Sequence, residues 1–349
     1  MQNNQAVTSE IKRKNVNPWV KTFGSLDWIY IIGILGSFIA IALTYDAFTG
    51  EKEDGTLRLL LSNNVPRYKL LIGKFLGAFL ALFIPLVIGQ LVSLIILNVS
   101  GSINLTMYEY QKIAGIVVLS WMYLTVFIFI GLFVSSLTHN SSSSLIILLF
   151  IWIVSTVIIP GSSSIFARNI YKLPESDEID KQVWSLQTEA TNENLSTIEK
   201  AKIQYERHRL IGEIRDEYRN KKFAQVEIAR AFTRISPMGT LTYGTEAFAG
   251  VGLVRQKHLI NQMLAYKNRL GEFILSEERR LSDDPKGILF SSTLPRKAFN
   301  TDAIPVFQEQ RMTICEGFGN ALLDMAILIL YGFVFFTGAY VSFNRYDVR

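Results

Sequence analysis

The sequence predicts an all-α, polytopic helical membrane protein with five spans and a helical extracytoplasmic domain. Hydrophobic residues make up 49% of the 349 residues, and they are gathered in blocks separated by charged stretches. A helix needs roughly 20 apolar residues to cross a hydrocarbon core of about 30 Å. A single segment in lipid satisfies its own backbone polar groups only as a helix. The blocks that reach or approach this length are Trp28–Leu43, Leu76–Val99, Ile113–Leu137, Leu145–Pro160 and Ala321–Phe343.

Charge and cysteine content argue against several other classes of protein. The formal net charge is +5, and the chain has one cysteine, Cys315, and three histidines that are far apart. Basic residues commonly flank membrane spans, so this charge does not require a nucleic-acid partner. A single cysteine cannot form an intramolecular disulfide and offers no cysteine-rich metal site. We therefore expect the chain to bind no nucleic acid, metal or cofactor.

The stretch Tyr45–Lys74 organises the chain, because it is charged and lies between the first two apolar blocks. Gly50 is expected to end the first helix, and Gly55 permits a sharp turn. A short amphipathic helix, Leu57–Leu61, is expected next, with Thr56 as its N-cap. Basic residues follow where the next block begins, which predicts that the whole stretch is cytoplasmic.

The second half of the chain carries three expectations. The fourth apolar block is expected to end at Pro160, which is followed by glycine. Apolar residues recur near helical spacing over residues 180–232, which predicts one or two long helices. Asp324, near the start of the last block, either lines a pathway or caps the helix, and the dipole at a helix N-terminus favours the cap.

These patterns divide the chain into four regions. Residues 162–318 mix charges of both signs and contain no further span, so they are expected to form the outer helical domain. The regions are an N-terminal tail or end of an outer loop at 1–26, spans one to four at 27–161 with the cytoplasmic loop 45–74, the outer domain at 162–318, and the last span with a short cytoplasmic tail at 319–349.

The predicted topology contains one conflict. If residues 45–74 are cytoplasmic, five spans place residues 1–26 outside the membrane and the C-terminus inside. The four basic residues of the N-terminal tail disagree with an outside position, because short tails follow the positive-inside rule. An additional span before residue 1 would remove the conflict.

The loop and the start of the following block carry a recognisable pattern. Its form is D-x-x-x-G-E-x-E-x-G-T-L-x-x-L-L, followed by an arginine and a Gly-Lys pair. The matching residues are Asp46, Gly50, Glu51, Glu53, Gly55, Thr56, Leu57, Leu60 and Leu61, then Arg67, Gly73 and Lys74. In this pattern the chain resembles the permease subunits of type-2 ABC exporters. Its later part, including Thr245–Gly252 and Pro305–Phe307, is similar to the branch that contains the permease of nitrous-oxide-reductase maturation.

The resemblance implies a transporter in a bacterial inner membrane, built from two permease subunits and two ATP-hydrolysing subunits. The permease pair is a homodimer or a heterodimer, and the family usually has one span more than this chain, at the start. The loop would be a coupling helix seated on the ATPase subunit. The residues that the resemblance assigns to coupling are Glu51, Glu53, Gly55, Thr56, Leu57, Arg58, Leu60, Leu61, Arg67 and Lys74.

Motifs for catalysis are absent from the sequence. It contains no G-x-x-x-x-G-K-[ST] phosphate loop, no H-E-x-x-H and no G-x-S-x-G. We therefore expect ATP hydrolysis in a partner subunit and no catalytic residue in this chain. The apolar blocks and the outer domain fit a second class equally well, a membrane scaffold or sensor whose outer domain binds a partner without transport.

Overall fold

The computed structural model describes residues 28–62, 66–99, 105–188, 197–281, 303–310 and 313–345. These residues form helices and no strand, which confirms the all-α class. The predicted tail, residues 1–26, lies outside them. The helices are α3 (Trp28–Tyr30), η1 (Ile31–Gly36), α4 (Ser37–Ala42), α5 (Thr49–Glu53), α6 (Thr56–Ser62), α7 (Arg67–Val99), α8 (Met107–Leu137), α9 (Ser141–Ile153), η2 (Val154–Ile158), α10 (Ile159–Ile170), α11 (Ser176–Thr188), α12 (Thr197–Thr233), α13 (Pro237–Ala249), α14 (Gly252–Leu281) and α15 (Ile314–Asn344), where η marks a π-helical turn.

Apolar helices long enough to cross a bilayer make the chain a multi-pass membrane protein. Four helices reach this length among the described residues: Arg67–Val99, Met107–Leu137, Ser141–Ile170 and Cys315–Asn344. The first predicted span differs, because it forms a shorter apolar helix, Trp28–Ala42. Of the five predicted spans, four are full-length helices among the described residues, and the first is this shorter helix.

The helix that begins at Ser141 runs through Pro160, where the sequence predicted its end. The π-helical turn η2 interrupts the regular hydrogen-bond pattern just before the proline. Pro160 then lies in the first turn of α10, where a missing N–H has little effect. The carbonyl of Ser155, in η2, accepts a hydrogen bond from the Ser236 hydroxyl at the start of α13. A contact 81 residues away in the sequence thus helps the helix to continue.

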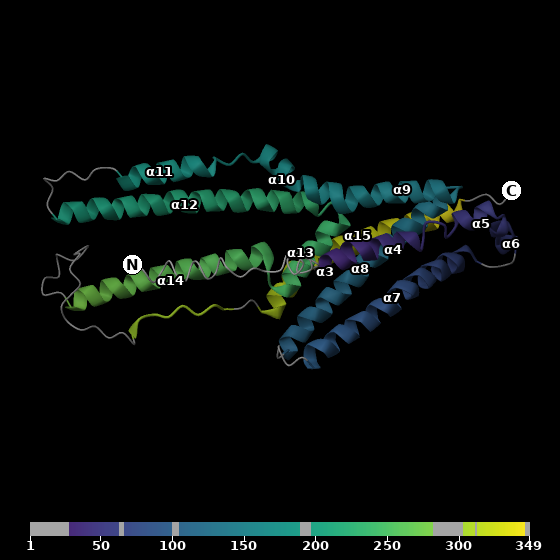
Figure 1. Cartoon of the computed structure of the whole chain (residues 1–349), viewed down its shortest axis with the longest axis horizontal. Helices are drawn as coiled ribbons and strands as arrows, with labels where there is room; N and C mark the ends of the chain where they lie inside the picture. Colours follow the sequence, from purple (N-terminus) through teal and green to yellow (C-terminus); the bar gives the residue numbers. More distant parts are fainter. Residues whose placement is uncertain are drawn as a thin grey trace, which may run out of the picture.

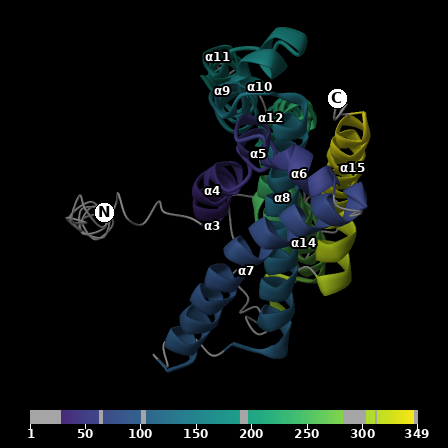
Figure 2. The ribbon, with the colours of Figure 1, turned by 90° about the vertical axis from the view of Figure 1, so that its right-hand side faces the viewer.

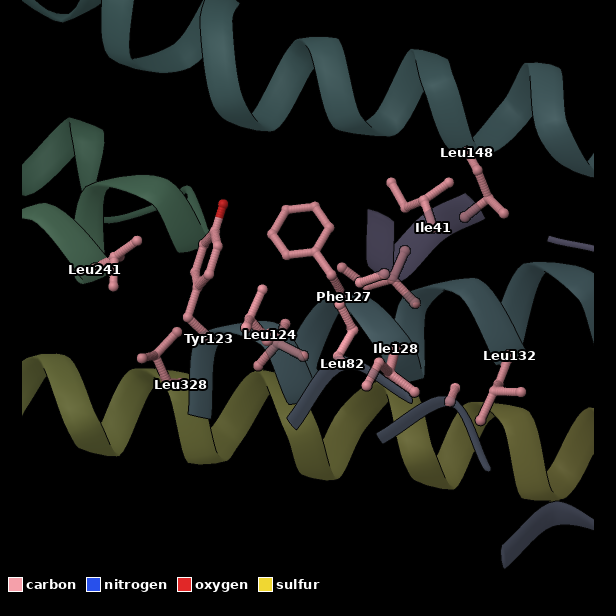
Figure 3. Packing of buried hydrophobic residues seen from close by; sticks show 14 of the residues in the cluster. Ile41, Leu82, Tyr123, Leu124, Phe127, Ile128, Leu132, Leu148, Leu241 and Leu328 are labelled. Atoms are coloured by element: carbon pink, nitrogen blue, oxygen red, sulfur yellow. The ribbon is translucent and has the colours of Figure 1, made fainter. Parts of the chain in front are cut away.

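Helix α8 is the centre of the bundle. Its most apolar stretch is 56% buried, whereas that of α7 is 6% buried. Figure 2 shows α8 between α4 and α15, and it packs against both. A Cβ atom on Gly131 of α8 would lie 1.8 Å from the Thr44 hydroxyl, so this glycine permits the close approach of the two segments. Figure 3 shows the buried α8 side chains beside Ile41 (α4), Leu82 (α7), Leu148 (α9), Leu241 (α13) and Leu328 (α15).

The two ends of the molecule differ in construction. Helices α11, α12 and α14 extend from one end of the bundle, and α5 and α6 lie at the opposite end (Figure 1). The stretch 180–232, which was predicted to form one or two long helices, is divided between α11 and α12. Helix α13 packs against α8 and α15. Helix α13, which lies within the region 162–318, is therefore packed into the bundle.

Candidate functional site

The loop between the first two apolar helices folds into two short helices, α5 and α6. Gly50 does not end a helix as predicted: its N–H donates to the carbonyl of Asp46 (2.9 Å), and it lies within α5. The sharp turn falls at Gly55, whose φ of +69° is the left-handed conformation that glycine tolerates best. Thr56 is the first residue of α6, and its hydroxyl donates to the carbonyl of Glu51 (3.3 Å).

Lys52 points from α5 onto the C-terminal end of α8. Its Nζ donates to the carbonyl oxygens of Ser136 (2.6 Å) and Thr138 (2.7 Å), with Ser135 at 3.4 Å. A positive charge is favourable there, because the last carbonyls of a helix carry the negative end of its dipole. Burial lowers the pKa of Lys52 to about 8. The ammonium therefore caps α8 at neutral pH.

Ser135 of α8 forms a second connection to α5, in which the side chain belongs to α8 and the backbone groups belong to α5. Its buried hydroxyl oxygen, on α8, accepts hydrogen bonds from the backbone N–H groups of Phe48 (2.9 Å) and Thr49 (3.2 Å). Both N–H groups lie at the start of α5, where a helix has no internal acceptors for them. Helix α5 is thus attached to α8 at both of its ends.

Glu53 attaches α5 to a second span. One carboxylate oxygen accepts from the backbone N–H of Ser141 (2.9 Å), and the other accepts from the Ser141 hydroxyl (2.7 Å). Ser141 is the first residue of α9, so the carboxylate lies at the positive end of that helix. The two hydrogen bonds from Ser141 lower the pKa of Glu53.

The remaining charged residues connect the loop to α7 and α15. Glu51 forms an ion pair with Lys74 on α7. Arg67, the first residue of α7, donates to the carbonyls of Phe343 (3.0 Å) and Asn344 (2.6 Å), where α15 ends. The loop and its flanking residues therefore contact the ends of α8, α9 and α15 and the first turns of α7.

Helix α6 does not expose every leucine that the resemblance assigns to coupling. Leu57 is 1% exposed and packs inside the chain, so it is not available for direct contact with a partner. Leu59 is 69% exposed, and its neighbour Arg58 is exposed as well. Leu60 is half-buried, and the side chain of Leu61 lies outside the described residues.

A second group of charged side chains lies where the C-terminal end of α12 meets α13 and α15. Asp324 of α15 is fully buried, and its two oxygens accept from Arg234 at 2.7 and 3.1 Å. The expectation that Asp324 caps its helix is wrong, because α15 begins earlier and is capped by Thr313 with Glu316. Asp324 instead connects α15 to the C-terminal end of α12.

One turn earlier on α12, Arg230 repeats this arrangement. Its guanidinium lies 3.2 Å from a carboxylate oxygen of Glu246 on α13. The ring of Tyr243, also on α13, lies 4.2 Å from the guanidinium carbon of Arg230 and 5.4 Å from that of Arg234. These two arginines therefore join α12 to α13 and α15 through charge pairs and ring contacts.

Comparison with known proteins assigns the family. The model of the ABC-2 family transporter proteins matches residues 1–348. The chain belongs to the ABC-2 family. Two curated relatives share a stretch of 51 residues, both called probable ABC transporter permease protein NosY. The protein from Pseudomonas aeruginosa is 53% identical over this stretch and that from Stutzerimonas stutzeri 49%. The stretch is 15% of this chain and 18% of each relative's length.

In this ABC-2 protein, the residues proposed for coupling separate into two groups. Glu51, Glu53, Arg67 and Lys74 contact other helices of the chain, whereas Gly55, Thr56 and Arg58 are exposed. The sequence interpretation missed Lys52, Ser135 and Leu59. A signal for Leu59 exists, because two residues along a helix turn the side chain by about 200°, away from the face of Leu57. No local pattern connects Lys52 to carbonyls more than 80 residues away.

Proposed function

We propose that this chain is the membrane-spanning permease of an ABC exporter, and that α5 and α6 couple it to a separate ATP-hydrolysing subunit. The observation that carries the proposal is the set of contacts around the loop. Lys52, Glu53, Arg67 and the Glu51–Lys74 pair join it to four helices. These contacts come from α5 and from the first residue of α7, and α6 lies between them in the chain. A displacement of α6 that carries α5 with it therefore shifts the ends of these helices together.

The contacts suit a mechanical role. Transporters change state through rigid-body motion of packed elements, and a partner drives such a change only by binding the two states with different affinity. Helix α6 offers the partner an exposed surface at Arg58 and Leu59. The nucleotide-dependent movement of the ATPase would act on that surface, and the buried Leu57 would transmit it to the bundle.

The assembly follows from this role. The chain would lie in the inner membrane with α5 and α6 in the cytoplasm and with α11, α12 and α14 on the outer side. A second permease subunit, identical or related, would complete the pathway, and each permease would bind one ATPase subunit. A scaffold without transport would keep the same spans but would need no ATPase at α6.

Copurification tests the docking surface. The substitutions Glu51→Lys and Leu57→Asp would break contacts inside the chain, so Arg58→Glu with Leu59→Asp is the sharper variant. We expect it to lose the ATP-hydrolysing subunit from the purified complex and to abolish stimulation of ATPase activity. The matched control is Trp184→Asp, since Trp184 is 66% exposed on α11 at the opposite end. Full retention of the ATPase by the double variant would reject docking at α6.

Cysteine labelling tests the orientation separately. In a Cys315→Ser background, a cysteine at the exposed Ser62 of α6 should react with a membrane-impermeant maleimide only after the membrane is permeabilised. A cysteine at the exposed Ser185 of α11 should react in intact cells. The reverse pattern would place the long helices in the cytoplasm.

A further inference from the structure

A large apolar cavity lies where α3, α7, α8 and α13 meet, away from the α5–α6 loop. Its volume is about 830 Å³, within the range of about 300–1,000 Å³ that is common for ligand pockets. Aliphatic and aromatic side chains form most of its wall, including Leu91 and Leu94 of α7 and Ile113 and Val117 of α8. The wall therefore suits the apolar body of a ligand.

Three polar atoms of this wall have no hydrogen-bond partner among the described residues. They are Nε2 of Gln90 on α7, Nε1 of Trp121 on α8 and Oγ1 of Thr245 on α13, and all three are buried. A buried polar group left without a partner costs about 1–3 kcal/mol. These atoms come from three different helices, and they line one cavity.

Other polar side chains of the same wall are satisfied within the chain. Ser93 donates to the carbonyl of Gly89 (2.8 Å), Tyr110 to the side chain of Asn98 (2.9 Å), and Trp28 to the Ser120 hydroxyl (2.9 Å). The missing partners are therefore confined to Gln90, Trp121 and Thr245, while these other polar side chains of the wall have theirs. Nε2 of Gln90 and Nε1 of Trp121 are donors only, so their missing partner is an acceptor.

Charge narrows the class of ligand further. Glu246 is the only residue of this wall that carries a formal charge, and that charge is negative. The Glu246 carboxylate is paired with Arg230 (3.2 Å), and the wall itself contains no cation for a free inorganic anion. An uncharged acceptor, such as an ester carbonyl, matches the donors and needs no cation.

The position of the cavity fits a molecule that comes from the bilayer. Its α7 residues lie between Val87 and Leu97, in the half of the helix that is far from the α5–α6 loop. Only 6% of the residues in the most apolar stretch of α7 are buried, so the other described helices leave most of this helix uncovered. An acyl chain can therefore reach this region from the uncovered side of α7.

We propose that this cavity binds one glycerolipid, with an acyl chain along the apolar wall and an ester carbonyl accepting hydrogen bonds from Gln90 and Trp121. The Thr245 hydroxyl supplies a third hydrogen bond from α13. The bound lipid thus joins α7, α8 and α13, three helices that meet around the cavity. This proposal does not rest on the coupling role of α6.

Native mass spectrometry of the delipidated full-length chain tests the site. The probe is 1-palmitoyl-2-oleoyl-phosphatidylethanolamine, added in detergent without nucleotide or ATPase. The wild-type chain should retain one molecule at low probe concentration. Val117→Trp fills the cavity and should remove this saturable binding. Thr245→Val and Trp121→Phe each remove one hydrogen bond and should weaken binding about threefold to tenfold.

Matched controls separate the cavity from the rest of the lipid-facing surface. Thr125→Val and Trp152→Phe should bind like wild type, because the Thr125 hydroxyl donates to Trp121 O (2.8 Å) and Trp152 Nε1 donates to Ser37 (2.8 Å). Glycerophosphoethanolamine, which has the head group without acyl chains or esters, should not compete. Equal binding by wild type and Val117→Trp, or no saturable binding by wild type, would overturn the proposal. Either result would leave the copurification test of α6 unaffected.

Discussion

The two charged regions of this molecule use their charges in different ways. Around α5 and α6, charged side chains bind mainly the ends of other helices, as Lys52 does at α8 and Glu53 at α9, and one ion pair, Glu51–Lys74, adds to these contacts. In the bundle, charged side chains bind each other, as Arg234 binds Asp324 and Arg230 binds Glu246. The loop therefore connects many helix ends through single residues, whereas the arginines of α12 each connect one pair of elements.

This difference predicts how each region responds to substitution. In the bundle, removing one partner leaves a mostly buried charge without its counter-charge, so the loss of stability is large. At the loop, Glu53 is exposed and Lys52 is half-buried, so water replaces part of a lost contact. The loss of stability is therefore smaller, and the loss of coupling is the greater effect. The substitutions below test this contrast, from the largest expected change to the smallest.

Asp324→Asn should give the largest loss of stability. It leaves Arg234 beside an uncharged amide, and breaking a fully buried ion pair costs about 3–5 kcal/mol. The loss here should be lower than that, because the Arg234 side chain is 24% exposed and water reaches its charge. The midpoint of thermal unfolding in detergent should fall strongly. Glu206→Gln is the control, because its pair with Arg209 is exposed on α12 and contributes about 0–1 kcal/mol. Equal midpoints for the two variants would show that the buried pair does not hold α12 to α15.

Lys52→Met should have an intermediate effect on stability and a larger effect on coupling. It removes the charged donor from the carbonyls of Ser136 and Thr138, and a hydrogen bond to a charged group contributes about 1.5–3 kcal/mol. ATPase stimulation should fall while the ATPase subunit still copurifies. Lys69→Met, at an exposed position of α7, is the control. If the Lys52→Met variant stimulated ATPase activity as the wild type does, the contact of Lys52 with the end of α8 would not be needed for coupling.

Gly55→Ala and Gly50→Ala form a matched pair within the loop. An alanine at φ +69° is strained by about 1 kcal/mol, whereas alanine in a helix is favoured over glycine by about 1 kcal/mol. A Cβ at residue 50 would lie 3.8 Å from Asp46 Cβ, an ordinary contact. Unfolding midpoints should therefore move in opposite directions. A shift in the same direction would contradict the turn at Gly55 or the helical position of Gly50.

Glu53→Gln should give the smallest effect, and one that depends on pH. The pKa of Glu53 is lowered in the folded chain by the hydrogen bonds from Ser141, so the carboxylate stabilises the fold above its unfolded pKa. This contribution is lost as pH falls through the folded pKa. The difference in unfolding midpoint between wild type and Glu53→Gln should shrink from pH 6 to pH 3. Asp54→Asn, at the exposed neighbouring residue, is the control.

The sequence predicts well those features that depend on local pattern. Apolar blocks predicted the helices of the bundle, because the length and composition of a span are properties of one segment. The turn at Gly55 was predicted for the same reason, since its backbone conformation depends on the residue itself. The predicted break at Gly50 failed because a single glycine weakens a helix by only about 1 kcal/mol, less than the contacts of Thr49 and Lys52 contribute.

Features that depend on distant contacts were not predicted. The continuation of a span through Pro160 involves a π-helical turn and the hydroxyl of Ser236, which no pattern near residue 160 indicates. The role of Asp324 required the position of Arg234, 90 residues earlier in the chain. The group of unpaired atoms at Gln90, Trp121 and Thr245 exists only because three helices meet. Tertiary structure, and not local sequence, brings these residues together.

Photocrosslinking from two exposed residues tests the central claim most directly. Leu59 on α6 is 69% exposed and Trp184 on α11 is 66% exposed, so the two positions match in exposure and differ in location. A photoreactive p-benzoylphenylalanine at residue 59 should crosslink to an ATP-hydrolysing subunit in whole cells, and the same group at residue 184 should not. A crosslink to that subunit from residue 184, with none from residue 59, would contradict coupling through α6.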